Sequence, residues 1–338
     1  MPPIHRPNLP RIITYYQTHH DASGQLISAL PLVTAKGIEL THLIVGAIHL
    51  NDDPNGMTLN DHHPDHERFT SLWAELRILQ ASGVKVLGML GGAAKGSYER
   101  LDQDRLTFER YYVPLRDMVR RRGLDGLDLD VEEPMSLAGI IRLIDRLRAD
   151  FGRDFILTLA PVAAALLDPM RNLSGFDYEA LEVMRGSEIA WYNTQFYCGW
   201  GDCSNPLMYE MIVARGWPAN KVVVGMVTNP ENGAGHVPWE SLSTVIPLLV
   251  GRHPNFAGVS GWEYFNSLPG GREKPWEWAE CMTGLLRGEK PIPPTALHQW
   301  ADRASHALVD IDPDSQGDGA APVPCEFEYH TDTDTDVD

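Results

Sequence analysis

Residues 123–133 read Gly-Leu-Asp-Gly-Leu-Asp-Leu-Asp-Val-Glu-Glu. Successive side chains of a β-strand point to opposite faces of its sheet. A strand over this stretch therefore places Asp128, Asp130 and Glu132 on one face and the intervening leucines and valine on the other. A solvated acidic loop has no reason to alternate acids with apolar residues so strictly, so we predict a strand that ends near Glu132.

Seven further apolar, β-branched runs flank this strand along the chain. Together the eight runs lie at residues 11–18, 41–50, 84–92, 123–132, 155–162, 189–197, 221–229 and 256–266. Helical patterns separate them, most clearly at 69–81 and at 134–151, where Pro134 suits a first helical turn. Alternating strands and helices indicate a parallel sheet, and eight strands close a barrel whose interior side chains just fill it.

An open doubly wound sheet is the competing architecture. That fold normally carries a glycine-rich turn after its first strand, but residues 16–21 read Tyr-Gln-Thr-His-His-Asp. We therefore predict an α/β fold, a single-domain (β/α)8 TIM barrel over residues 11–295. A short lead at 1–10 precedes this domain, and an extension at 296–338 follows it.

The three acids of the strand at 123–132 indicate a catalytic site. Both faces of a barrel strand are normally apolar, so carboxylates on the interior face are costly unless they have a function. Glu132 falls at the carboxyl end of its strand, where the active sites of such barrels lie. Crowded carboxylates share protons and raise one another's pKa, which suits an acid that must stay protonated near neutral pH.

Residues 125–132 resemble the DGxDxDxE signature of family 18 glycoside hydrolases, which include chitinases and endo-β-N-acetylglucosaminidases. The resemblance covers roughly residues 11–285, and residues 225–242 are similar to plant and fungal class III-type members. Short matches recur in other strands, at Leu90-Gly91-Gly92, Leu159-Ala160-Pro161, Gln195-Phe196-Tyr197 and Gly261-Trp262. The resemblance implies a retaining endo-glycosidase acting on N-acetylglucosamine linkages, without a metal or another cofactor.

The resemblance also implies a role for each acid. Glu132 would protonate the leaving sugar oxygen and then act as base, and Asp130 would orient the substrate's 2-acetamido group. Asp128 would tune Asp130 through a shared proton. In this substrate-assisted reaction the acetamide oxygen attacks the anomeric carbon, and water opens the oxazolinium intermediate with retention.

A set of substrate-binding residues follows from the same resemblance. Tyr197, with Gln195, would hydrogen-bond the acetamide, and Trp262 would form the apolar floor beneath the reacting sugar. Packing alone would also account for these three side chains, because polar pairs and aromatic rings fill barrel interiors. The other expected lining residues are Tyr16, Gly91, Gly92 and Asn193.

The chain departs from the family pattern at three places. Many members carry a Tyr-Asp pair in the sixth strand, where this chain has Tyr192-Asn193, and a Ser before the third-strand glycines, where it has Leu90. Many also hold a sizeable insertion between strands seven and eight, but here residues 230–255 just accommodate a helical crossover. We therefore expect a shallower, more open groove.

Two other features indicate chemistry less strongly. Residues 61–67 read Asp-His-His-Pro-Asp-His-Glu, but their spacing matches no zinc motif, so we expect a solvated loop near the barrel mouth. Four tryptophans in expected loops or first helical turns suit sugar stacking and packing equally: Trp200, Trp239, Trp276 and Trp278.

Composition restricts the partners. The chain has 338 residues and a net charge of −18, so neither nucleic acid nor an anionic membrane is an expected partner. Residues 310–338 contain eight Asp, two Glu and no Lys or Arg, which predicts a disordered acidic tail.

The lead at 1–10 has no apolar stretch of signal-peptide length, and no run approaches a membrane span, so we expect a cytoplasmic protein.

Three functions remain open at this point. An open groove and a cytoplasmic location favour an endo-β-N-acetylglucosaminidase that cleaves the chitobiose core of N-glycans. An endochitinase acting on chitin or chitooligosaccharides cleaves the same linkage, so the catalytic residues do not separate the two. An inactive chitinase-like sugar-binding protein is a third alternative, but such proteins typically lose the acid that Glu132 supplies.

Overall fold

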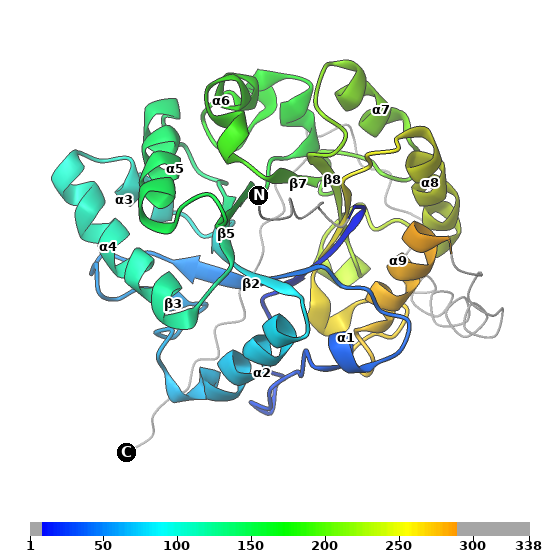
Figure 1. Ribbon diagram of the computed structural model, residues 1–338, viewed down its shortest axis with the longest axis horizontal. Coiled ribbons are helices and arrows are strands. Elements are labelled where there is room, and N and C mark those ends of the chain that lie inside the picture. The colour runs from blue at the N-terminus through cyan, green and yellow to red at the C-terminus, as the bar shows by residue number, and fades with distance from the viewer. Residues whose placement is uncertain (1–8, 289–338) are drawn as a thin grey trace, which may run out of the picture.

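Eight parallel strands form a closed barrel in the computed structural model, which describes residues 9–288 (Figure 1). The strands are β1 (Arg11–Tyr16), β2 (His42–His49), β4 (Lys85–Gly91), β5 (Gly126–Asp130), β6 (Ile156–Leu159), β7 (Trp191–Gln195), β8 (Val222–Val227) and β9 (Gly258–Trp262). β1 pairs with both β2 and β9, which closes the ring. Each predicted apolar run holds one of these strands, so the predicted (β/α)8 barrel is confirmed. The extension at 296–338 and most of the lead at 1–10 lie outside the described residues.

Helices form an outer ring around the strands (Figure 1). They are α1 (Pro31–Thr34), α2 (Thr70–Ala81), α3 (Ser97–Leu101), α4 (Arg105–Arg122), α5 (Leu137–Phe151), α6 (Tyr178–Arg185), α7 (Leu207–Ala214), α8 (Trp239–Arg252) and α9 (Glu277–Arg287). A two-residue strand, β3 (Thr58–Leu59), adds antiparallel to β2. Between β8 and β9 the chain forms only α8 and a 3₁₀ turn at Pro230–Asn232, so this connection has no large insertion.

Both predicted helices are present, but one begins later than expected. The pattern at 69–81 forms α2, which a 3₁₀ turn at Glu67–Phe69 precedes. The pattern at 134–151 forms α5, which begins only at Leu137 because the Ser136 side chain caps it by accepting from the Gly139 amide. The expectation that Pro134 occupies the first turn is therefore wrong. The segment before the cap bonds elsewhere, since the Met135 amide donates to the Ser174 carbonyl at 2.8 Å.

The strands separate two apolar layers. Leu127 and Leu129 of β5 are fully buried in the layer shared with the surrounding helices. A smaller cluster fills the barrel interior, with members such as Ile13, Leu87 and Val223 from three different strands. The predicted alternation of β5 therefore holds, because its leucines face the helices and its aspartates face the interior.

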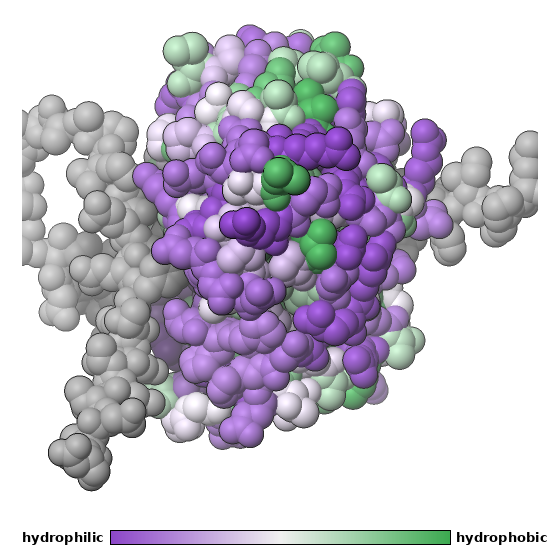
Figure 2. Space-filling view, turned by 90° about the vertical axis from the view of Figure 1, so that its left-hand side faces the viewer, coloured by the Kyte–Doolittle hydropathy of each residue, from purple (hydrophilic) through white to green (hydrophobic). Residues whose placement is uncertain are grey.

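The outer surface of the helices is largely polar. Figure 2 shows the side of the molecule that α3, α4 and α5 cover, where hydrophilic residues dominate and hydrophobic ones gather mainly toward the top. This is the pattern expected of amphipathic helices that bury one stripe against a barrel. Within residues 9–288, no helix combines the length and the apolar character that crossing a bilayer requires.

Candidate active site

Asp128 lies at the centre of a hydrogen-bond network inside the barrel. Its side chain is 0% exposed and accepts three hydrogen bonds, from the Tyr15 hydroxyl at 2.7 Å, the Thr158 hydroxyl at 2.5 Å and the Asn193 amide at 3.0 Å. Burial raises the pKa of the Asp128 carboxyl, and the three hydrogen bonds act in the opposite direction. The network fixes this carboxyl in one orientation below the mouth of the barrel.

Asp130 and Glu132 share one amide donor. The Gln195 Nε2 lies 2.9 Å from the Glu132 Oε1, 3.3 Å from the Asp130 Oδ1 and 3.0 Å from the Ala160 carbonyl oxygen. An amide nitrogen has only two hydrogens for these three acceptors. Gln195 therefore bridges the two carboxyl groups, with the shorter contact to Glu132.

This proximity changes the acidity of both carboxyl groups. The pKa of Asp130 is raised well above its ordinary value of 3.8, first by burial and then by the negative charges of Glu132 and Asp128. Burial also raises the pKa of Glu132 above 4.5, against the hydrogen bond from Gln195. The stack of acids therefore retains protons at a pH at which isolated carboxyl groups would lose them.

Two aromatic side chains line the cleft beside the acids. Tyr197 follows β7, and burial together with the charges of Asp130 and Glu132 raises the pKa of its hydroxyl, so it stays a hydrogen-bond donor at neutral pH. Trp262 ends β9, and its ring meets the Tyr15 ring edge to face at 5.4 Å between centroids. Tyr197, Gln195 and Trp262 all line this cleft.

The glycine pair allows the end of β4 to approach Asp130 closely. Gly91 has a φ of 93°, and a Cβ atom there would lie 2.5 Å from the Asp130 carbonyl oxygen. The Gly92 amide donates to that carbonyl at 2.9 Å. Gly92 lines the cleft, whereas Gly91 lies outside the lining and packs against the Asp130 backbone.

Besides Gly91, two further expected lining residues, Tyr16 and Asn193, lie outside the cleft lining. Tyr16 is fully buried in the helix-side layer, and its hydroxyl donates to the Ile27 carbonyl at 2.5 Å. The interior position belongs to the preceding residue, Tyr15, because adjacent strand residues face opposite ways. Asn193 is buried beneath the cleft, where it bonds Asp128 and accepts from the Trp191 indole at 2.8 Å.

A cleft of about 1240 Å³ opens above the acids, and it is asymmetric. β9 is the fourth strand from β5 in either direction around the ring, so it lies directly opposite. Among the described residues, β5 and β7 and the loops that follow them contribute Asp130, Glu132, Gln195 and Tyr197 to the lining. Most of the remaining wall comes from the segments that follow β9 and its neighbours β1 and β8, within 17–31, 231–232 and 262–276. Smaller parts come from 60–69, after β2 and β3, and from 89–93 at the end of β4.

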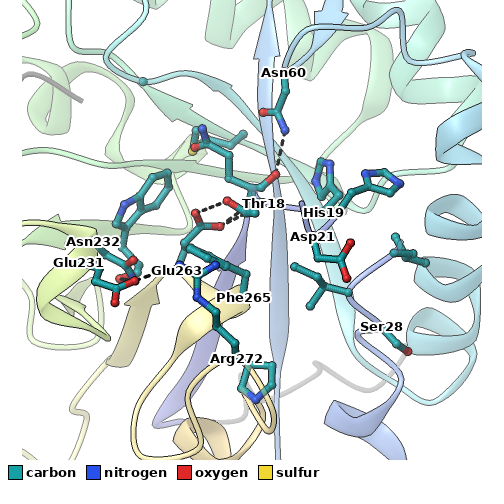
Figure 3. Close-up of a pocket in the computed structure, with 18 of the residues that line it drawn as sticks. Thr18, His19, Asp21, Ser28, Asn60, Glu231, Asn232, Glu263, Phe265 and Arg272 are labelled. Carbon is teal, nitrogen blue, oxygen red and sulfur yellow. Dashed lines mark hydrogen bonds and ion pairs between the residues drawn. The ribbon is translucent and has the colours of Figure 1, made fainter. Parts of the chain in front are cut away.

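The opposite walls carry polar residues that sequence analysis did not identify. Figure 3 shows Glu263 beside Thr18, with Asn60 on one side and the pair of Glu231 and Arg272 on the other. The Arg272 guanidinium donates to Glu231 at 3.1 Å. These residues follow four different strands (β1, β3, β8 and β9), and only the closed barrel brings them together.

The remaining candidates divide between cleft and core. Asp61 and His62 of the histidine-rich loop line the cleft, as expected of a loop near the mouth. Within residues 9–288, no group of three or more His, Cys, Asp or Glu has the arrangement of a metal site. Of the four tryptophans, Trp276 lines the cleft, whereas the other three pack in or against the core: Trp200, Trp239 and Trp278.

Comparison with known protein families and sequences gives a consistent result. Residues 11–235 match the family model of glycosyl hydrolases family 18. The chain is 28% identical over 208 residues to Chitinase 2 of Rhizopus oligosporus, a match that spans 56% of this chain and 36% of that protein. Chitinase 1 of Rhizopus niveus is 26% identical over 213 residues, or 56% of this chain and 39% of that protein. The match therefore spans well under half the length of these curated relatives.

Two solved structures are more similar. A fungal endo-β-N-acetylglucosaminidase is 53% identical with a TM-score of 0.81, and the alignment covers 84% of this chain and 100% of that one. A chitinase from Aspergillus fumigatus is 60% identical with a TM-score of 0.75, and the alignment covers 80% of this chain and 96% of that one. Their names differ in substrate, so the comparison alone does not choose between the two.

Proposed function

This chain belongs to family 18 of the glycosyl hydrolases, and we propose that it is a retaining endo-β-N-acetylglucosaminidase that cleaves the chitobiose core of N-glycans. In such a reaction one N-acetylglucosamine stays on the protein and the rest of the glycan is released. The two halves of the substrate therefore differ greatly in size and surroundings, and the site must accommodate that difference.

The asymmetry of the cleft is the observation that carries this proposal. Glu132, as the acid, must lie beside the leaving sugar, whereas Trp262 on the opposite strand underlies the sugar that is attacked. Most of the cleft wall lies on the Trp262 side. The released glycan would thus be held in the cleft, and the sugar attached to bulky polypeptide would lie on the open side near Glu132.

The acidity of the three carboxyl groups supports substrate-assisted catalysis. Burial raises the pKa of Glu132 and so favours its protonated form, which can donate its proton to the leaving oxygen as the glycosidic bond breaks. The substrate's acetamide oxygen forms the new bond to the anomeric carbon. Asp130, which lines the cleft, accepts from the acetamide N–H and stabilises the positive charge that develops on the oxazolinium ring.

Hydrolysis of the intermediate uses the same residues in reverse. Glu132, now ionised, accepts a proton from water as the water oxygen attacks the anomeric carbon. The ring opens and the acetamide is regenerated, so the configuration at that carbon is retained. Tyr197 donates a hydrogen bond to the acetamide, and Asp128 shares a proton with Asp130 in both steps.

An endochitinase is the second candidate, and one observation favours it. The chain shares 60% identity with a solved fungal chitinase. Chitin repeats the linkage that joins the two core N-acetylglucosamines, so the same acids would serve. What differs is the leaving side, which in chitin is a further regular oligomer rather than a glycosylated polypeptide.

Offering both substrates side by side tests the proposal. A defined high-mannose N-glycopeptide and an N-acetylglucosamine tetramer are each incubated with the enzyme, and products are identified by mass spectrometry. We expect a peptide that retains one N-acetylglucosamine, formed faster than any fragment of the tetramer. Cleavage of the tetramer alone would reject the proposal in favour of a chitinase.

A substitution at the acid provides the control. Glu132→Gln removes the ionisable proton but keeps the size of the side chain, so both activities disappear if either belongs to this site. A glycopeptide activity that survives this substitution would come from a contaminant or from another site. Binding of both sugars without turnover by the parent protein would support the inactive sugar-binding alternative.

A further inference from the structure

Glu263 joins the last strand of the barrel to the segment that leaves the first. It follows Trp262 directly and is 7% exposed. Its Oε2 accepts from the Gln17 amide at 3.0 Å and the Thr18 amide at 2.8 Å, and its Oε1 accepts from the Thr18 hydroxyl at 2.8 Å. Figure 3 shows Glu263 facing Thr18, with dashed lines that mark hydrogen bonds between them.

The hydrogen bonds continue from Gln17 to the segment that follows β3. The Asn60 side-chain amide donates to the Gln17 carbonyl at 2.8 Å, and the Asn60 Oδ1 accepts from the Ala47 amide at 2.9 Å. Ala47 belongs to β2, and Asn60 follows β3. One chain of hydrogen bonds therefore links Glu263 to the walls that follow the first two barrel strands.

The backbone of Glu263 is itself firmly held. Its carbonyl oxygen accepts from the Thr228 hydroxyl at 2.7 Å and from the Ser267 hydroxyl at 2.8 Å. Thr228 follows β8, and Ser267 follows the 3₁₀ turn at Tyr264–Asn266. The side chain of Glu263 thus projects from a fixed point immediately beside Trp262.

A carboxylate is the side chain best suited to this position. It has two accepting oxygens and no hydrogen, so it can take three donors that converge from one segment. A glutamine in its place would offer a single accepting oxygen and would present hydrogens toward the other donor. Burial raises the pKa of Glu263, a cost that a surface position would avoid.

We propose that Glu263 is a positioning residue, which holds the Gln17–Thr18 wall against the strand carrying Trp262 and so fixes the reacting sugar relative to Glu132 and Asp130. Gln17, Thr18, Asn60 and Glu263 all line the cleft. The inference rests on the proposed place of that sugar over Trp262. It does not depend on whether the substrate is an N-glycan or chitin.

Three variants test this role, with kinetics measured on whichever substrate the parent enzyme cleaves faster. Glu263→Ala removes all three hydrogen bonds, and we expect kcat/KM to fall about tenfold to 100-fold, as small misplacements of a substrate do. Glu263→Gln keeps an acceptor for the two amides, so it should recover a substantial part of that loss. Thr18→Val removes only the hydroxyl donor and should give the smallest effect.

Asp104 offers a matched control for a purely structural role. It accepts from the amides of Leu106 and Thr107 and from the Thr107 hydroxyl, the same donor types that Glu263 binds, but at the start of α4 and away from the cleft lining. Asp104→Ala should lower the melting temperature and leave kcat and KM at parent values. Unfolding curves for all variants separate lost stability from lost catalysis.

The outcomes are distinct. If the kinetic constants of Glu263→Ala match those of the Asp104→Ala control, the carboxylate only stabilises the fold and the proposal is overturned. If Glu263→Gln is as impaired as Glu263→Ala while folded, the charge acts directly and positioning is again rejected. Failure of the proposed catalytic site would show differently: Glu132→Gln would then retain full activity. The Glu263 variants do not give that result, so the two failures can be told apart.

Discussion

The Tyr15 hydroxyl donates a 2.7 Å hydrogen bond to the Asp128 carboxylate across the barrel interior. Because Tyr15 also packs edge to face against Trp262, one side chain contacts both the lowest acid and the apolar floor. Tyr15 thus couples the acids to Trp262, so a substitution at Tyr15 should alter the environment of both.

Tyr15→Phe removes this donor and leaves the ring in place. The bond favours the ionised form of Asp128, so its loss should raise the pKa of that carboxyl further and move the acid limb of the kcat profile to higher pH. Tyr16→Phe is the matched control, since the Tyr16 hydroxyl bonds only backbone carbonyls on the helix side. It should lose about 0.5–1.5 kcal/mol of stability with an unchanged pH profile. Identical profiles for the two variants would contradict the prediction.

Glu132→Gln should lower kcat by about 10²- to 10⁴-fold, because a general acid contributes a factor of this size. Sugar binding should survive, and titration calorimetry with a non-cleaved oligosaccharide checks this. Glu240→Gln, an exposed substitution at the start of α8, controls for the loss of one carboxylate. Equal turnover by Glu132→Gln and the parent would exclude Glu132 as the acid.

Asp130→Asn should impair hydrolysis more than binding. Its carboxylate is needed most when positive charge develops on the acetamide, which happens after the substrate is bound. Single-turnover rates and the dissociation constant of a product oligosaccharide separate the two effects. An affinity loss as large as the rate loss would mean that Asp130 acts mainly in ground-state binding.

The contribution of Asp130 and Glu132 to the free energy of unfolding should fall as the pH rises. Asp130 and Glu132 have raised pKa values in the folded chain, so the folded state binds more protons than the unfolded state does. Their contribution is fully present below the ordinary values of 3.8 and 4.5, and it is lost as the pH rises through the raised ones. Asp130→Asn should therefore raise the melting temperature at pH 7 and have little effect near pH 4. A variant that is destabilised at pH 7 would contradict this.

The sequence predicts the centre of the site better than its walls. Strict alternation in residues 123–133 is sufficient to place Asp128 and Asp130 inside the barrel, because only one face of that strand is apolar. On β1 the same reasoning fails. Both faces of that strand are buried, so periodicity does not show which of Tyr15 and Tyr16 faces the acids, and the inward residue is Tyr15.

The walls could not be predicted for a different reason. Glu263 lies inside the run predicted at 256–266, although β9 itself ends at Trp262, and nothing in that run indicates which side chains Glu263 meets. Its partners Gln17 and Thr18 lie about 245 residues away along the chain. Only ring closure brings them together, and no local pattern encodes which loop side chains then meet. Pro134 shows the same limit at a smaller scale, because a later Ser136 cap sets where α5 begins.

The pairing of β1 with β9 has a consequence for biosynthesis. A nascent chain that has emerged only as far as β8 already carries all three acids, but it lacks Trp262 and Glu263. Such a chain has an unpaired barrel edge, no platform for a sugar ring and no anchor for the loop after β1. The cleft with its acids, its apolar floor and its anchored first loop is therefore complete only after the final strand has docked.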